Sequence, residues 1–450
     1  MVSLRLIGLW TQVPPARVPH NIRMRFAASL LPVLLALPAA ASTYTPRGYI
    51  TAALESSPSL RSSQKTWEKA QNAYRAALFD AGLPTLTLSL TNRLYDDEDP
   101  TWRLRRRETA SSLSANWNLY DSSRSPLIKV KSARLDHEAA CLAFETARQD
   151  EALKALRRFF ALYSARRRVV TAQADLKSRE RQHADTKEQF DSGTRSRIDL
   201  TQSEGDKLQS EVSLAQAQAA ARKALFSFNE LLNAEPDAEQ GVEVSSSAAP
   251  ALGPAAGDLS RALRDNVALG AARVTLEKTR LSAGASLRGS LPVLKVDAAW
   301  TKTGLGVVGE PGRRGTGNPD YSAGASLSLP FGFLGAQNAF NIAGQRAAAE
   351  AGELTLRDAE RAFKTAFLNA REDIELQTKS LKLLEFQVKA QQEATDNLLV
   401  EYSQGGAQFL QLDTAQSKLR ESSNALTDAT NALELSRAGY AVLLGEAFWE

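Results

Sequence analysis

The strongest constraint on this chain is a long stretch without helix breakers. Residues 127–192 contain neither proline nor glycine, and at 1.5 Å rise per residue they would form a helix of roughly 100 Å. Leu153, Leu156 and Phe160 follow the three-four spacing of a coiled-coil seam. Gly193 interrupts this run, and a second periodic run follows it. The sequence therefore predicts a helical hairpin with arms at about 126–190 and 196–232.

The same hairpin is predicted a second time near the C-terminus. The break Phe190-Asp191-Ser192-Gly193 is matched by Tyr402-Ser403-Gln404-Gly405. The same spacing separates Leu231-Leu232-Asn233 from Leu443-Leu444-Gly445. The chain is therefore an internal duplication rather than a many-copy solenoid. The second pair of helices is expected at about 335–402 and 408–444.

A hydrophobic period of two marks a pair of strands before each long hairpin. Leu86, Leu88 and Leu90 alternate with hydroxyl side chains, and Leu327 and Leu329 do the same in the second half. This alternation is typical of strands with one apolar face. The strands are expected at about 84–95 and 110–120 in the first repeat, and at about 292–302 and 321–331 in the second.

Two motifs near these strands imitate ligand sites. Gly304-Leu305-Gly306-Val307-Val308-Gly309 has the spacing of a dinucleotide-binding loop, but Pro311 prevents the helix that such a site needs immediately afterwards. The acidic run Asp96–Asp99 lacks the glycine and the spaced acids of a calcium loop. Both motifs are interpreted as exposed hairpin loops.

The N-terminal segment has the features of an export signal. Arg25 is followed by sixteen uncharged residues that end in Ala39-Ala40-Ala41. The run is short for a membrane span and is broken by two prolines, and Met24 can serve as the true start. The chain is thus divided into a signal peptide at 1–41, a first repeat at 42–233, a connector at 234–257 and a second repeat at 258–450.

Composition excludes several classes of function. The chain has 55 basic and 51 acidic side chains, and four of the basic ones lie in the signal, so the mature chain is neutral and gives a nucleic acid no electrostatic support. Cys141 is the only cysteine, and the three histidines include one in the signal. The material for a metal centre or a histidine-based triad is missing. We expect no cofactor and no enzymatic activity.

Four strands in one chain pose a closure problem. A lone hairpin is marginal in water, and open strand edges are excluded from lipid. About eight strands are needed for even a barrel filled by side chains. Two chains would supply such a filled barrel, whereas three chains would supply twelve strands and an open lumen. Strands of about ten residues also suit an outer-membrane span.

The order of elements, its duplication, the Leu-Pro-x-Leu strand entries at Leu83 and Leu291 and the two Phe/Tyr-x-x-Gly breaks resemble those of the TolC-type outer-membrane efflux proteins. The resemblance covers the mature chain from about Tyr49 to Gly445. It implies an α+β membrane protein that forms a homotrimer in the outer membrane of a Gram-negative bacterium. Twelve transmembrane strands would form a β-barrel, continued into the periplasm by a barrel of twelve coiled-coil helices. It also implies an exit duct for a tripartite efflux pump or a type I secretion system, with a periplasmic adaptor and an inner-membrane transporter as partners.

The resemblance also indicates candidate site residues at the two helix breaks. The hairpin tips that face the adaptor would be Gly193, Thr194 and Arg195 in the first repeat and Gly405, Gly406 and Ala407 in the second. The periplasmic constriction would involve Asp199 and Tyr402, which match family positions that link the two hairpins, together with Gln411 and Thr414. The last two stand where the family often has aspartates, so an aspartate ring is not expected. Asp413 is acidic but is turned about 100° away around the helix.

Two other classes of function remain open at this stage. A periplasmic coiled-coil adaptor or scaffold without a pore would also contain long helical hairpins, although adaptors usually carry one hairpin set in small β-domains. An envelope hydrolase is the weakest alternative, because no nucleophile and base occur together.

Overall fold

The computed structural model describes residues 43–99, 102–121, 125–244, 253–288, 291, 293–307, 314–316, 318–328, 335–403 and 409–449. The expected signal peptide lies outside these residues. So do three of the proposed tip residues, Gly405, Gly406 and Ala407.

Most of the described chain is helical. The helices are α1 (Pro46–Ser56), α2 (Pro58–Gly82), α3 (Ser125–Asp191), α4 (Arg197–Leu232), α5 (Ala255–Asp265), α6 (Val267–Arg288), α7 (Ala336–Ser403) and α8 (Phe409–Leu444). The strands are β1 (Thr43–Tyr44), β2 (Thr85–Asp99), β3 (Trp102–Asp121), β4 (Gly241–Val242), β5 (Val293–Val307), β6 (Arg314–Thr316) and β7 (Asp320–Ser328). Two helices, two main strands and two more helices therefore occur in that order twice.

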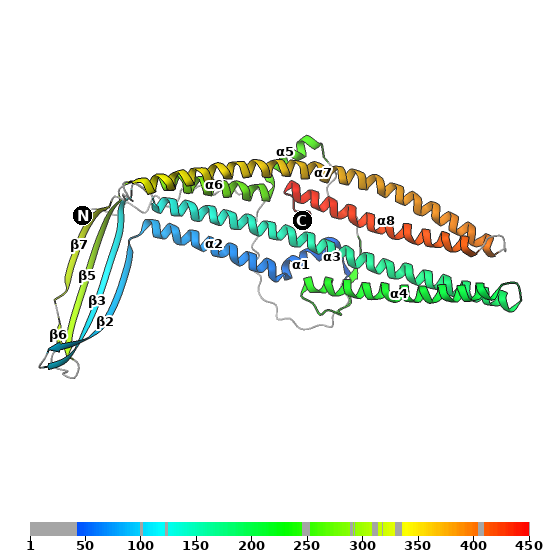
Figure 1. Cartoon of the computed structure of the whole chain (residues 1–450), viewed down its shortest axis with the longest axis horizontal. Coiled ribbons are helices and arrows are strands. Elements are labelled where there is room, and N and C mark those ends of the chain that lie inside the picture. The colour runs from blue at the N-terminus through cyan, green and yellow to red at the C-terminus, as the bar shows by residue number, and fades with distance from the viewer. Residues whose placement is uncertain are drawn as a thin grey trace.

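The elements form an elongated molecule with the sheet at one end and the helix tips at the other (Figure 1). Next to the sheet, α3 lies between α2 and α6, and α7 packs on α6. Farther from the sheet, α3 packs on α4 and α8, and α7 packs on α8. The two long helices α3 and α7 therefore run through both levels and join the sheet to the tips.

Matching caps mark corresponding places in the two repeats. Ser57 separates α1 from α2, and its Oγ accepts a hydrogen bond from the Leu60 amide. Asn266 separates α5 from α6, and its Oδ1 accepts one from the Leu269 amide at 3.1 Å. At the ends of α4 and α8, Asn233 and Gly445 both have positive φ, 53° and 77°. Only glycine and asparagine adopt this conformation readily, which explains these two residue types at helix ends.

Each repeat has its own aromatic core near the middle of the molecule. In the first, Tyr49 stacks on Phe228 with ring centroids 3.9 Å apart, and its hydroxyl donates to the Phe228 carbonyl oxygen. In the second, Phe367 packs against Tyr440, whose hydroxyl donates to Asp258 at 3.0 Å. Burial raises the pKa of Tyr440 to about 12, with the Asp258 carboxylate adding to the effect. These cores fix the helices of each repeat to one another.

The apolar face of α3 is broader than a simple coiled-coil seam. Leu156 and Phe160 of the expected seam are buried, but Phe159 and Leu162 beside them are fully buried as well. Val170, which continues the same three-four spacing farther along α3, is 57% exposed. The reason is that α3 contacts α1, α2, α4, α6 and α8 at different levels, so its buried face changes along its length.

The main strands form one antiparallel sheet in the order β2-β3-β5, with β6 and β7 both pairing with β5. The β2–β3 ladder continues to Asp99 and Trp102, so most of the charged segment expected to be a loop belongs to the strands. No proline or glycine occurs between Thr85 and Asp99, and charge alone does not end a strand. Gly304–Val307, expected in a loop, likewise lie within β5.

The sheet exposes apolar side chains and two unpaired edges. Leu86, Leu88 and Leu90 on one face of β2 are 68%, 67% and 76% exposed, and Leu327 of β7 is 72% exposed. Among the described strands, β2 pairs only with β3 and β7 only with β5. Within the described residues, no helix is both long enough and apolar enough to cross a membrane.

Candidate functional site at the helix tips

The first hairpin turns at Gly193. Its φ of 77° lies in the left-handed region, and its amide donates to the Phe190 carbonyl oxygen at 2.9 Å. The Thr194 and Arg195 amides both donate to the Gln189 carbonyl oxygen, at 2.9 and 3.2 Å. These bonds satisfy carbonyl groups that the end of α3 would otherwise leave unpaired. Gly193, Thr194 and Arg195 therefore form one hydrogen-bonded turn at the end of the molecule.

Asp199 lies in the first turn of the return helix α4 and forms a capping box with Ser196. The Ser196 Oγ accepts from the Asp199 amide at 3.2 Å, and the Asp199 Oδ2 accepts from the Ser196 amide at 3.2 Å. The Ser196 hydroxyl also donates to Oδ2 at 2.9 Å. Hydrogen bonds from Ser196 hold the pKa of Asp199 below its usual range. The carboxylate of Asp199 is thus engaged within its own hairpin.

The contact from the first tip to the second hairpin is made by Arg195. Its guanidinium lies over the Tyr402 ring, 5.9 Å from the ring centre, while its Nε donates to the Gln189 side chain at 3.0 Å. Tyr402 is therefore joined to the first hairpin through Arg195. Asp199 follows Arg195 by four residues in the sequence. Such a cation–π contact contributes about 0.5 to 1 kcal/mol at an exposed site.

Gln411 and Thr414 lie on the exposed side of the first turns of α8. The Thr414 hydroxyl donates to the Leu410 carbonyl oxygen of its own helix at 2.7 Å. Between them in sequence, Asp413 is turned toward α3 and forms an ion pair with Arg179. The acid next to the predicted constriction residues thus connects the two hairpins.

This ion pair belongs to a network of alternating charges between α3 and α8. Arg179 is 6% exposed and lies 3.9 Å from Asp175, one turn earlier on α3. The other oxygen of Asp175 accepts from Arg420 of α8 at 2.7 Å and from Ser210 of α4 at 3.0 Å. Two carboxylates and two guanidiniums therefore connect α3 with α8, and each charge has an opposite partner. The Ser210 hydroxyl joins α4 to this network.

Asp206 of α4 lies within the electrostatic field of this network. Burial raises the pKa of Asp206 above its usual value, the Arg179 charge partly offsets this, and the Asp413 charge adds to it. Nearby, the His183 ring hydrogen-bonds to Ser203 across α3 and α4 at 3.0 Å. Polar side chains thus occupy the interior where the apolar cores have ended.

Sequence reasoning did not identify Asp175, Arg179 and Arg420. The one available signal was an Asp and an Arg four residues apart on α3, a spacing that places both on one face of a helix. Such pairs are common on exposed helix faces and carry no information about a partner in another hairpin. Arg168, which pairs with Asp428 of α8 at 2.7 Å, was missed for the same reason.

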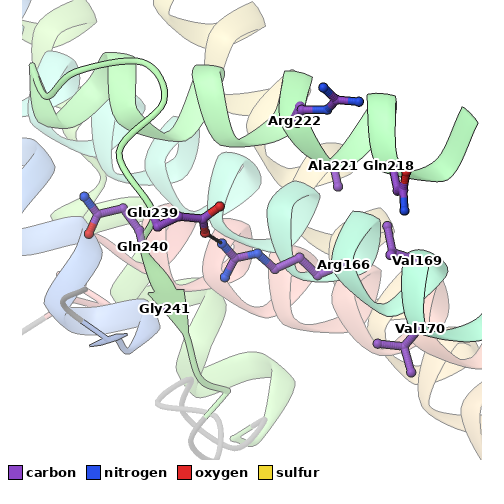
Figure 2. Close-up of a pocket in the computed structure, with 9 residues that line it drawn as sticks. All are labelled: Arg166, Val169, Val170, Gln218, Ala221, Arg222, Glu239, Gln240 and Gly241. Carbon is purple, nitrogen blue, oxygen red and sulfur yellow. Dashed lines mark hydrogen bonds and ion pairs between the residues drawn. The ribbon is translucent and has the colours of Figure 1, made fainter. Parts of the chain in front are cut away.

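A separate hollow of about 690 Å³ lies beside α3 and α4 (Figure 2). Arg166 and Glu239 meet at its rim, with 3.5 Å between nitrogen and oxygen. The remaining lining residues come from α3, α4 and the segment after α4: Val169, Val170, Gln218, Ala221, Arg222, Gln240 and Gly241. This set contains no nucleophile with a base, and among the described residues no group of three or more His, Cys, Asp or Glu could hold a metal ion.

Comparison with known proteins identifies the fold. Residues 49–234 match the model of the outer membrane efflux protein family. No curated protein sequence matches the chain. Solved structures that match it include the outer membrane protein VceC of Vibrio cholerae, the CmeC outer membrane channel of Campylobacter jejuni and the open state of the MtrE outer membrane channel of Neisseria gonorrhoeae.

These structures match nearly the full length of the chain at low identity. VceC is 17% identical with a TM-score of 0.69, over 90% of this chain and 96% of that one. CmeC is 12% identical at 0.74, over 89% and 85%, and MtrE is 19% identical at 0.70, over 89% and 89%. Residues 49–234 therefore match the outer membrane efflux protein family, and the chain as a whole has the fold of these outer-membrane channels.

Proposed function

We propose that this chain is the outer-membrane exit duct of a tripartite efflux pump or a type I secretion system. Three copies would each contribute four strands to a twelve-stranded barrel in the outer membrane, continued by twelve helices into the periplasm. The duct would conduct substrates passively, and a periplasmic adaptor with an inner-membrane transporter would supply docking and energy. The family match over the first repeat supports this assignment.

The observation that carries the proposal is the sheet with its two unpaired edges. β2 and β7 each lack a second neighbour among the described strands, and such edges are not tolerated in lipid. Joining β2 of one copy to β7 of the next would close the sheet. The exposed leucines of β2 would then face lipid while the hydroxyl residues between them face the lumen, the alternation typical of transmembrane barrels.

The adaptor would dock at the tips, through Gly193, Thr194 and Arg195 and through Gly405, Gly406 and Ala407 of the second break. The turn between α3 and α4 lies at the end of the molecule that is farthest from the sheet (Figure 1). The backbone and hydroxyl groups of this turn lie at the surface, where a partner can reach them.

The constriction would be set by the contacts that tie the hairpins together just above the tips. Arg195 on Tyr402, and Arg179 with Asp413, would hold the α7–α8 hairpin against the α3–α4 hairpin and keep the mouth narrow. Asp199 would fix the start of α4, and Gln411 and Thr414 would line the opening. Breaking the links would let the hairpins separate, which widens the duct.

The first experiment measures the native mass of the mature chain, extracted in detergent from bacterial envelopes, by light scattering. A mass of three chains is expected. Single-channel currents in planar bilayers then compare the native chain with Asp413→Asn, which removes the charge that holds Arg179. We expect a larger conductance for the variant, and an unchanged one for Asp428→Asn, whose partner Arg168 lies farther from the tips.

A stable monomer would leave the sheet with open edges, and the duct would have to be abandoned in favour of a periplasmic scaffold. If the protein is a trimer but both variants have the same conductance, the duct assignment stands. The Arg179–Asp413 link would then not control the width of the opening.

A further inference from the structure

The two faces of the sheet differ in chemistry. Residues that pair across an antiparallel ladder lie on the same face, and neighbours along one strand lie on opposite faces. One row of pairs crosses β2, β3, β5 and β7 through Leu88, Leu113, Trp300 and Tyr321. The exposed leucines of β2 and Leu327 of β7 belong to the same face, which we call the apolar face.

The opposite face is lined mainly by hydroxyl groups, and we call it the polar face. Ser89 and Ser112 pair across β2 and β3, with their hydroxyl oxygens 2.8 Å apart. Other hydroxyl residues of this face are Thr87, Thr91, Ser114, Thr301, Ser322 and Ser326. In the proposed barrel the apolar face meets lipid, so the polar face lines the lumen.

Three charged residues interrupt the polar face among the strand residues whose side chains the structure describes. They are Lys295, Asp297 and Asp320. Asp320 is the first residue of β7, and Lys295 lies near the start of β5. Asp297 lies within the ladder and pairs with Asn116 of β3 on one side and with Gly324 of β7 on the other. Its place on the polar face is therefore fixed by both neighbouring strands.

Gly324 makes room for the Asp297 carboxylate. A Cβ at Gly324 would lie 3.1 and 3.2 Å from the two carboxylate oxygens of Asp297, closer than ordinary van der Waals contact. The carboxylate thus lies over the backbone of β7 at this position. Glycine weakens a strand interior and often marks a place where another group approaches the backbone closely. Here the approaching group is the Asp297 carboxylate.

The charge of Asp297 is unpaired. Within the described part of the chain, its carboxylate has no ion-pair or hydrogen-bond partner. Lys295 is on the same face, but it lies two residues away, about 7 Å along the strand. A carboxylate without a partner on a hydroxyl-lined surface attracts cations and repels anions.

The residues predicted at the constriction supply no such charge. Gln411 and Thr414 are neutral, and Asp413 between them is paired with Arg179 of α3. These three residues therefore give the duct no unpaired acid near the tips. Asp297 is at the opposite end of the molecule, in the sheet (Figure 1).

We propose that Asp297 favours cationic over anionic cargo during passage through the barrel. Three copies would place three carboxylates at one level of the lumen, where their electrostatic potentials add. Lys295, one row nearer the helices on the same face, would oppose this preference. The inference rests on the proposed trimeric duct and specifies the charge of the cargo that the duct would favour.

Reversal potentials of single channels in planar bilayers, measured across a gradient of KCl, test the role of Asp297. Asp297→Asn should lower the permeability ratio of potassium to chloride by about twofold, because the attracting charge is removed from the lumen. Lys295→Gln should raise the ratio. Lys302→Gln is the matched control on the same strand and should leave the ratio unchanged, since Lys302 lies on the apolar face, where it pairs with Ser111.

Two further measurements separate charge from packing. Asp297→Glu keeps the carboxylate and should retain the native ratio. The difference between the native chain and Asp297→Asn should shrink as KCl rises from about 0.1 M to about 1 M, because the Debye length falls from about 10 Å to about 3 Å.

The outcomes distinguish this inference from the duct itself. An unchanged ratio for Asp297→Asn in a trimeric, conducting protein would overturn the role of Asp297 and leave the duct standing. An equal shift for Asp297→Glu, or any matching shift for Lys302→Gln, would also overturn that role, since neither should change the charge in the lumen. A native chain that is monomeric or forms no channels would remove the duct and this inference with it.

Discussion

Arg179 of α3 and Asp413 of α8 form an ion pair between the two helical hairpins, and the Arg179 side chain is only 6% exposed. A buried guanidinium is stable only while its partners remain, because the cost of removing it from water is offset by their opposite charge. The pair therefore makes the stability of a buried charge in one hairpin depend on a carboxylate of the other.

Replacing Asp413 by Asn should destabilise the packing of α8 on α3. Breaking a buried pair costs about 3 to 5 kcal/mol, and we expect the lower end because Asp413 is 30% exposed. Thermal unfolding followed by circular dichroism measures the loss. The exchanged pair Arg179→Asp with Asp413→Arg should recover part of it, and a double variant no more stable than the sum of its single changes would show that the two residues act independently.

Asp206 gives a pH dependence whose sign follows from its raised pKa. Because the folded chain holds this proton more tightly, the free energy of unfolding falls as pH rises from the unfolded pKa, about 4, through the folded value. Asp206→Asn should therefore stabilise the protein at neutral pH and lose this effect at acidic pH. Thermal midpoints at several pH values provide the test, and a variant that is less stable at neutral pH would contradict it.

Asp199 should show the opposite pH dependence, because the Ser196 hydrogen bonds lower its pKa. Its contribution is complete above the unfolded pKa and is lost as pH falls through the folded value. Ser196→Ala removes the capping box and should cost about 1 kcal/mol. Hydrogen exchange at the first amides of α4 should rise in this variant, whereas Thr201→Ala, one turn farther on, should leave it unchanged.

Gly193 should tolerate only residues that accept a positive φ. A Cβ at this position meets nothing within 4 Å, so the cost of Gly193→Ala comes from its φ of 77° alone and should be about 1 to 2 kcal/mol. Gly193→Asn should cost less, and Gly193→Val more. Equal unfolding midpoints for all three variants would show that the turn adapts its backbone.

Much of this architecture follows from local rules in the sequence. The absence of proline and glycine from residues 127–192 indicated one helix, and α3 extends from Ser125 to Asp191. Gly193 indicated the turn because glycine adopts a positive φ without strain. The strands extend farther than expected, since the charged residues after Arg93 do not by themselves end a ladder. The assignment of tip residues to an adaptor stays a prediction.

The helices, the turns, the paired strands and their duplication could all be predicted from the residues, because these features depend on backbone conformation and on periodicity within short stretches. The packed helices were needed to show that Asp413 meets Arg179, that Arg420 meets Asp175 and that α4 and α7 are the outermost helices away from the sheet. These contacts join residues far apart in the chain, and their geometry depends on how α3 is rotated against three other helices. A charged residue on a helix carries no local sign of its distant partner, so the polar network could be found only after the hairpins were packed.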